Sequence, residues 1–177
     1  VFTNNHNGAF SPIRSYKTGS QGPCSIEAFD ADGDGDQDLA TANYDSNSVT
    51  ILYNDGSGVF NSVNQYTAGS GATCLKSADV DRDGDPDLVV VNREIGNVAI
   101  LRNDGKGSFE YPSSYRVGEG PSYVSVADLD ADSDLDLAVS NSASDDVTIL
   151  LNNGAGEFKH LADFSSGDGP GTIAAKD

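Results

Sequence analysis

The sequence predicts an all-β fold assembled from β-propeller blades, each made of four antiparallel strands. The first observation is a repeat, because features along the 177 residues recur at a step of 49. The second is that each unit holds short segments rich in Val, Ile, Leu, Thr and Tyr between Gly, Asn, Asp and Ser turns, a pattern typical of strands. The third is that no segment keeps the apolar period of a helix. Four strands in a unit of this length favour propeller blades, since a β-helix has much shorter repeats.

Three acidic runs mark the repeat most clearly. Each contains five Asp residues at alternate positions, and together they hold 15 of the 28 acidic residues. The members are Asp30, Asp32, Asp34, Asp36 and Asp38; Asp79, Asp81, Asp83, Asp85 and Asp87; and Asp128, Asp130, Asp132, Asp134 and Asp136. A glycine-rich segment recurs at the same step as residues 54–60, 103–109 and 152–158, with a degenerate copy at 4–10. A period this long and regular indicates one supersecondary unit stacked several times.

The expected strands follow one another in the same order in every unit. The first strand of the first complete unit covers about residues 25–29 and leads into an acidic run. Second strands are expected at 38–43, 87–92 and 136–141, third strands at 49–54, 98–103 and 147–152, and a fourth strand at about 63–68. Residues 88–91 and 149–151 are apolar at consecutive positions, which predicts sheets packed on both faces, as in stacked blades.

We expect a single repeat region over residues 1–177 that does not close a propeller. Complete blades are predicted at 24–72, 73–121 and 122–169, a partial blade with strands three and four at 1–23, and the first strand of a further blade at 170–177. These about 3.6 repeats fall short of the roughly 4 to 8 blades of a propeller. Either the chain is a fragment of a longer propeller or array, or two copies meet to complete one. We favour the fragment, because the sequence stops inside an expected acidic loop.

The formal net charge of −18 excludes some partners. A surface this acidic repels phosphate groups, so nucleic acid and anionic membrane surfaces are poor partners. No apolar run approaches the ~18 residues of a transmembrane helix, so membrane insertion is not expected. The chain has no Met and begins with Val1, which we interpret as a processed or excised chain.

The acidic runs predict three calcium sites. In the pattern Asp-x-Asp-x-Asp-Gly-x-x-Asp, hard oxygen ligands converge as the chain curls around an ion, and such ligands suit calcium. Position six favours Gly because of the sharp turn there, often with φ > 0. Gly35 and Gly84 fit, whereas Ser133 departs from the pattern and predicts a weaker third site. A solvated acidic turn is the poorer interpretation, because unrelieved repulsion would be repeated three times. A fourth site would begin at Asp177.

Residues 29–40, with the sequence FDADGDGDQDLA, resemble the calcium loop of the FG-GAP repeat and its bacterial VCBS-type relatives. Residues 49–54 and 58–60 and the Gly-Pro pairs at 22–23, 120–121 and 169–170 match that repeat too, so the resemblance covers essentially the whole chain. It implies a propeller like the integrin α-chain head, with calcium loops between first and second strands and ligands at positions one, three, five, seven and nine. Family members are mostly extracellular adhesion heads, lectin-like binders or appendages of surface enzymes.

These observations favour a calcium-stabilised extracellular or cell-surface module for adhesion or for binding a glycan or protein ligand. The alternatives are a structural spacer in a large surface protein, or the non-catalytic propeller of an enzyme whose active domain lies outside this chain. We expect no enzyme activity, because the chain lacks a nucleophile elbow, a phosphate-binding Gly loop and a zinc pattern. The loops at the rim opposite the acidic runs differ most between units, and Tyr44, Arg93 and Tyr123 are best suited to anchor a ligand there.

Cys24 and Cys74 are interpreted as the same position in successive units, with Tyr123 at that position in the third. A disulfide and two buried free thiols are equally compatible with this placement.

Overall fold

The computed structural model describes residues 1, 4, 7–9 and 14–175, and within them the chain forms twelve β-strands and no helix. The first sheet contains β1 (Pro23–Phe29), β2 (Asp38–Asn43), β3 (Ser48–Asn54) and β4 (Phe60–Thr67). The second contains β5 (Ala72–Ala78), β6 (Asp87–Asn92), β7 (Asn97–Leu101) and β8 (Ser113–Arg116). The third contains β9 (Pro121–Ala127), β10 (Asp136–Asn141), β11 (Asp146–Asn152) and β12 (Phe158–Ser165).

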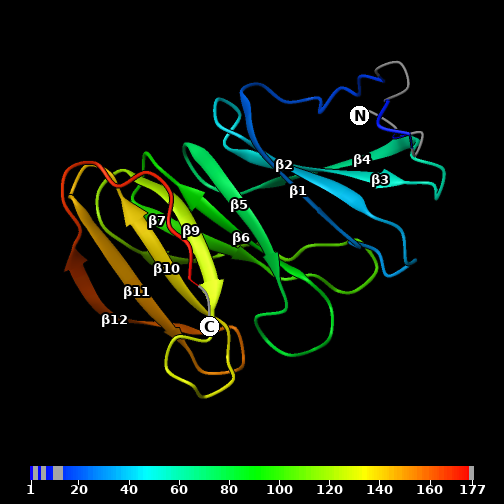
Figure 1. Ribbon diagram of the computed structural model, residues 1–177. Coiled ribbons are helices and arrows are strands. Elements are labelled where there is room, and N and C mark those ends of the chain that lie inside the picture. The colour runs from blue at the N-terminus through cyan, green and yellow to red at the C-terminus, as the bar shows by residue number, and fades with distance from the viewer. Residues whose placement is uncertain (2–3, 5–6, 10–13, 176–177) are drawn as a thin grey trace.

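Each sheet is a blade whose four antiparallel strands lie in sequence order. The three blades succeed one another without closing, as Figure 1 shows. The first strand of the middle blade, β5, packs against β1 on one side and β9 on the other. The predicted all-β architecture of an incomplete propeller is therefore confirmed. No described segment is a helix long and apolar enough to cross a membrane.

Strand boundaries follow the sequence pattern closely, and the main exception has a chemical cause. The three second strands have the predicted bounds. The fourth strand of the second blade is only four residues long and begins at Ser113, whereas its counterparts have eight residues. Pro112 precedes it, and Pro has no backbone N–H to donate to the neighbouring strand. Asn103, expected to end the third strand, forms only an isolated bridge to Phe109.

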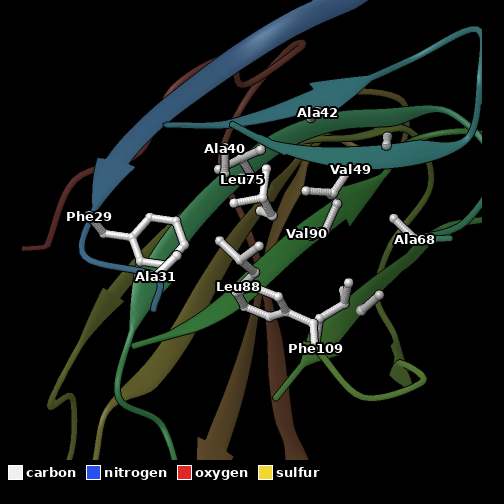
Figure 2. Close-up of a cluster of buried hydrophobic side chains, with 14 residues drawn as sticks. Phe29, Ala31, Ala40, Ala42, Val49, Ala68, Leu75, Leu88, Val90 and Phe109 are labelled. Carbon is white, nitrogen blue, oxygen red and sulfur yellow. The ribbon is translucent and has the colours of Figure 1, made fainter. Parts of the chain in front are cut away.

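The hydrophobic core lies between the blades, because the central strands bury both of their faces. All six residues of β6 are buried. Leu88 and Val90 belong to the cluster shared with the first blade, whereas Val89 and Val91 belong to the cluster shared with the third. Figure 2 shows the first cluster, where Leu88 and Val90 meet side chains from β2 and β3. The prediction of sheets packed on both faces is confirmed at this strand.

An aromatic pair recurs at each boundary between blades. The tyrosine of a fourth strand meets the phenylalanine of the next blade edge to face, and its hydroxyl donates to a glycine carbonyl two residues before that phenylalanine. The pairs are Tyr66 with Phe109 (ring centroids 5.2 Å apart, hydroxyl to Gly107 O 3.0 Å) and Tyr115 with Phe158 (5.3 Å, Gly156 O 3.3 Å). Tyr16 meets Phe60 in the same way (5.2 Å, Gly58 O 3.1 Å). These phenylalanines therefore lie between blades.

The two end segments pack on the blades without forming strands. Residues 14–18 and 172–175 have no regular strand, although Tyr16 contacts the first blade and the N–H of Ala175 donates to Ser125 Oγ at 3.0 Å on the third. The rest of the expected partial blade and further strand includes residues 2–3, 5–6, 10–13 and 176–177, which lie outside the described residues. The site expected to begin at Asp177 lies outside them as well.

Candidate metal centres

Three acidic loops each bring three carboxylates together. The loops connect β1 to β2, β5 to β6 and β9 to β10, so they lie at one rim of the blades. In every loop, carboxylate oxygens at positions one, three and nine lie within 4.8 Å of one another. The groups are Asp30, Asp32 and Asp38; Asp79, Asp81 and Asp87; and Asp128, Asp130 and Asp136. The carboxylates at positions five and seven, also predicted as ligands, do not belong to these groups.

The carboxylate at position nine is fully buried and holds the loop to the rest of its blade. In the first loop, Asp38 Oδ2 accepts the N–H of Ala31 at 2.9 Å, and its Oδ1 accepts the N–H of Asn54 at 2.7 Å. The other loops repeat both bonds: Asp87 with Val80 (3.2 Å) and Asn103 (2.8 Å), and Asp136 with Leu129 (2.8 Å) and Asn152 (2.8 Å). Each such Asp therefore has a structural contact on both of its oxygens, in addition to facing the candidate metal centre.

The carboxylate at position one holds the turn itself. Asp30 accepts the N–H groups of Gly33 at 2.8 Å and Gly35 at 2.9 Å. The third loop repeats these bonds, from Ala131 (2.8 Å) and Ser133 (2.9 Å) to Asp128, and the second repeats the bond from Gly84 (3.1 Å) to Asp79. The position-one carboxylate therefore fixes the backbone of the turn.

The turn has a left-handed backbone at two positions, of which the sequence revealed one. Position six has a φ of 91° at Gly35, 97° at Gly84 and 76° at Ser133, so Ser133 adopts the conformation that Gly provides elsewhere. Position four is also left-handed, with φ values of 75° at Gly33, 64° at Arg82 and 66° at Ala131. Sequence reasoning missed position four because only one of its three residues is Gly.

Burial and mutual repulsion disfavour the charged forms of these carboxylates. Burial, followed by neighbouring Asp charges, raises the pKa of the position-three residues Asp32, Asp81 and Asp130. Burial also raises the pKa of Asp87 to about 6. Oδ1 of Asp32 and Oδ1 of Asp79 are buried without a hydrogen-bond partner in the described part of the chain. A divalent cation would satisfy these oxygens and offset the repulsion, so the donor set fits a hard metal ion.

The side chains at positions five and seven contact other parts of their own blade and do not belong to the three-carboxylate groups. Position five accepts the N–H of position seven in every loop, at 2.9, 2.9 and 2.8 Å. Position seven lies against the glycine of the hairpin turn between the third and fourth strands of its own blade. A Cβ at Gly56 would lie 2.6 Å from Asp36 Oδ2, and one at Gly154 would lie 2.8 Å from Asp134 Oδ2. These glycines have positive φ values, 82° at Gly56 and 76° at Gly154, and they also leave room for a carboxylate.

Of the three predicted ligand-anchoring residues, Tyr44 and Arg93 lie near one groove, through Glu94, and Tyr123 lines a different one. Tyr44 follows β2, and a hydrogen bond to Glu94 raises the pKa of its hydroxyl. Arg93 lines a groove of about 380 Å³ between the second and third blades. Tyr123 was expected in a loop, but it lies within β9, where Lys76 Nζ is 5.8 Å from its ring centroid. The expectation of a shared rim position is wrong for Tyr123, because β9 begins two residues earlier.

Cys24 and Cys74 are not equivalent, and both are free thiols. Cys24 occupies a bulge in the pairing of β1 with β2, a place taken by Thr73 in the second blade. Cys74 follows that bulge, so its position corresponds to Ser25 of the first blade. The one-residue offset puts the two side chains in different surroundings, with Cys24 exposed and Cys74 buried. The interpretation as a shared position is therefore wrong.

Comparison with known proteins identifies both the repeat and the fold. A family model described as FG-GAP-like repeat matches residues 30–90 and again residues 79–139. No curated protein matches the chain. Among solved structures, a lectin of Agrocybe aegerita that specifically recognises non-reducing terminal N-acetylglucosamine matches with a TM-score of 0.60 and 22% identity. The match covers 93% of this chain and 46% of the lectin, so the chain spans about half the lectin's length. A Tc holotoxin pore of Photorhabdus luminescens matches with a TM-score of 0.47 and 22% identity, over 81% of this chain and 7% of that one.

Proposed function

The chain belongs to the FG-GAP-like repeat family, and from that premise we propose that it is a calcium-stabilised extracellular propeller module that binds a glycan or protein ligand and has no enzyme activity of its own. The observation that carries the calcium part is the threefold recurrence of three carboxylates within 4.8 Å of one another. In two of these groups a buried carboxylate oxygen has no hydrogen-bond partner among the described residues. Three neighbouring carboxylates repel one another, and a cation bound between them would offset this repulsion in every loop.

Calcium fits the loops better than magnesium does. Calcium accepts six to eight oxygen ligands in flexible geometry, whereas magnesium demands near-ideal octahedral geometry and keeps several waters. The three carboxylates of each group come from one curled loop, which leaves other coordination positions open to water. Three bound divalent ions would bring the formal net charge from −18 to −12. The expected consequence is a more stable fold, because an ion that binds only the folded chain stabilises it by mass action.

A calcium titration tests this part. At about 100 times the dissociation constant, one ion adds ~2.7 kcal/mol to the free energy of unfolding, which for a chain of this length raises Tm by roughly 5–10 °C. We expect calcium, and not magnesium at the same concentration, to raise Tm. Asp32→Asn should remove one of three ions counted by titration calorimetry, whereas Asp168→Asn, on an exposed loop, should leave three. An unchanged Tm with and without EGTA would refute the calcium part.

The ligand is proposed to bind at the opposite rim, in the groove between the second and third blades. Arg93 and Arg116 line this groove together with Glu119 and Ala143. Within the described part of the chain neither guanidinium forms an ion pair, so both can donate to a ligand. Side chains with several donors and acceptors suit sugar hydroxyls, and the similar lectin recognises a sugar. This supports a glycan as the first ligand class to test.

A glycan array, followed by calorimetry on any sugar that binds, tests the ligand part. Arg93→Ala and Arg116→Ala should each weaken binding, because both remove donors from the groove. Lys106→Ala removes a cation from an exposed turn at the calcium rim and serves as the control. Equal calcium-dependent Tm values would show that all variants fold alike. Binding that survives both arginine variants and is lost in the control would place the ligand at the other rim.

A further inference from the structure

The glycine-rich turn of each later blade is bonded directly to the acidic loop of the blade before it. Asn103 Nδ2 in the second blade donates to the carbonyl of Ala31, at 3.0 Å, and Ala31 lies between the candidate ligands Asp30 and Asp32. Asn152 Nδ2 in the third blade donates in the same way to the carbonyl of Val80, at 2.7 Å, between the ligands of the second loop. These bonds join residues 72 positions apart in the sequence.

The same asparagines are bonded to a candidate ligand of their own blade. The backbone N–H of Asn103 donates to Asp87 Oδ1 at 2.8 Å, and Asp87 Oδ2 accepts the N–H of Val80 at 3.2 Å. Since the Val80 carbonyl in turn accepts from Asn152, a continuous path of hydrogen bonds runs through the first, second and third loops. The residues on this path are almost completely buried: the exposed fraction is 0% for Ala31 and Asp87, 1% for Val80, 5% for Asn103 and 7% for Asn152.

We propose that the three metal centres are energetically coupled across the blade boundaries through Asn103 and Asn152, so that calcium binds cooperatively. The inference rests on the proposed calcium sites and adds to them a regulation of their affinity. Asn103 and Asn152 are positioning residues, because they donate to the loop backbone and to a candidate ligand and are not candidate ligands themselves.

The physical reason is that each asparagine contacts two loops: its side chain is bonded to the acidic loop of the preceding blade, and its backbone N–H is bonded to a candidate ligand in its own blade. An ion held by Asp30 and Asp32 fixes the peptide of Ala31 between them, which fixes the acceptor for Asn103 Nδ2. Asn103 is then ordered before the second loop binds its own ion, and its N–H orients Asp87 for that ion. Hydrogen bonds sheltered from water are stronger and more directional than exposed ones, so the path can transmit such a constraint. Binding at one site should therefore remove part of the ordering cost at its neighbour.

The first blade supplies a matched control, Asn54. Asn54 Nδ2 donates to the Gln37 carbonyl of its own loop at 3.1 Å, as Asn103 Nδ2 also does to the Pro86 carbonyl, at 3.1 Å. Among the described residues Asn54 has no bond to the loop of another blade. Both substitutions also remove the bond from the turn glycine two residues on, Gly56 to Asn54 Oδ1 or Gly105 to Asn103 Oδ1, each at 3.2 Å. Asn54→Ala removes one further bond within its blade, from the N–H of Gly58 at 2.9 Å, and only Asn103→Ala removes a contact between blades. Both variants keep the backbone N–H that donates to the position-nine carboxylate.

The experiment measures the coupling between sites one and two in the full chain with site three silenced by Asp130→Asn. Calcium is titrated by calorimetry into this chain and into chains that additionally carry Asp32→Asn or Asp81→Asn. The coupling factor is the product of the two stepwise affinities divided by the product of the two single-site affinities. We expect a factor of about 5 or more, falling to about 1 with Asn103→Ala and unchanged with Asn54→Ala.

Asn152→Ala provides an independent variant should Asn103→Ala fold poorly. It should abolish the coupling between sites two and three, measured with site one silenced, and leave the coupling between sites one and two. A factor of about 1 in the chain with both asparagines intact would overturn the proposal while leaving the calcium sites standing. A factor unchanged by Asn103→Ala or Asn152→Ala would overturn the assignment to these residues. Absence of any calcium binding would refute the proposed function first and this inference with it.

Discussion

Replacing Gly33 by Ala should destabilise the fold far more than the same change at Gly35, although both glycines lie in the first acidic loop. Both have a left-handed backbone, with φ values of 75° and 91°. At Gly35 a new Cβ would meet no atom within 4 Å, so only backbone strain counts. At Gly33 it would lie 2.9 Å from the carbonyl oxygen of Gly105 in the next blade. The comparison therefore separates strain inside a loop from contact between blades.

The magnitudes follow from these two situations. Left-handed strain costs roughly 1–2 kcal/mol, and the lower entropy of the unfolded Ala chain returns a part of it. Gly35→Ala should thus cost about 1 kcal/mol. Gly33→Ala adds an overpacked contact against backbone, typically ~1–3 kcal/mol more. At roughly 2–4 °C per kcal/mol for this chain length, Tm should fall by a few degrees in Gly35→Ala and by about 5–15 °C in Gly33→Ala.

The assay is thermal unfolding followed by circular dichroism, in EGTA so that differences in calcium affinity do not contribute. Urea unfolding of the same variants gives the free energies directly. Equal losses in the two variants would refute the reasoning. The boundary between the first and second blades would then accommodate a side chain at position four of the loop, as the next boundary does. There Arg82 occupies the position of Gly33 and forms an ion pair with Asp134.

Three further predictions concern the loops and the blade boundaries. Ser133→Gly should raise the calcium affinity of the third site and, in EGTA, raise stability by up to about 1 kcal/mol, because it relieves the strain of a Cβ at a φ of 76°; an unchanged affinity measured by calorimetry would show that the strain does not bear on binding. Tyr66→Ala should lower the free energy of unfolding by ~3–5 kcal/mol in a urea titration, since its ring packs edge to face on Phe109. Tyr111→Ala is the control and should cost almost nothing, because Tyr111 is 88% exposed. Calcium affinity of the second site should fall as the pH is lowered through about 6, the pKa to which burial raises Asp87, because a protonated carboxyl group competes with the ion. Without calcium, the free energy of unfolding should depend on pH in the opposite direction. A raised carboxyl pKa means that the folded chain binds the proton more tightly than the unfolded chain does, so the contribution of Asp87 to stability falls as the pH rises from about 4 to 6. Calorimetry at pH 5 and 7 and urea unfolding in EGTA over the same range check both signs.

Much of the fold could be predicted from the sequence because each motif that marks a strand or loop occurs in all three repeats. The second strands were placed correctly, since each begins at the last Asp of an acidic run and ends at an Asn. The short β8 was not foreseen, although Pro112 was the available signal. The offset between Cys24 and Cys74 could have been found from spacing, because the two residues are 50 positions apart whereas the repeat step of 49 aligns Cys24 with Thr73.

The candidate sites were predicted in part, and the missing part depends on packing. Positions one, three and nine meet as expected, because one short loop determines where they lie. The bond from Asn103 to Ala31 spans 72 residues and exists only because two blades stack in this register. In the Asn-x-Gly segments the glycines have φ > 0, which a tight turn explains. Nothing local indicates that the asparagine side chain reaches another blade.

The position-nine residue shows why the metal centre and the blade depend on each other. Asp38 accepts an N–H on each carboxylate oxygen and still faces the other two ligands. An Asn there would offer one acceptor and one donor, so its NH₂ group would face a backbone N–H inside a fully buried site. The loop thus requires a buried negative charge for structural reasons before any ion arrives. Burying that charge is costly unless it is compensated, and backbone hydrogen bonds supply only part of the compensation. A divalent cation at the same carboxylate would supply the rest, so the proposed calcium site would follow from how the blade is held together.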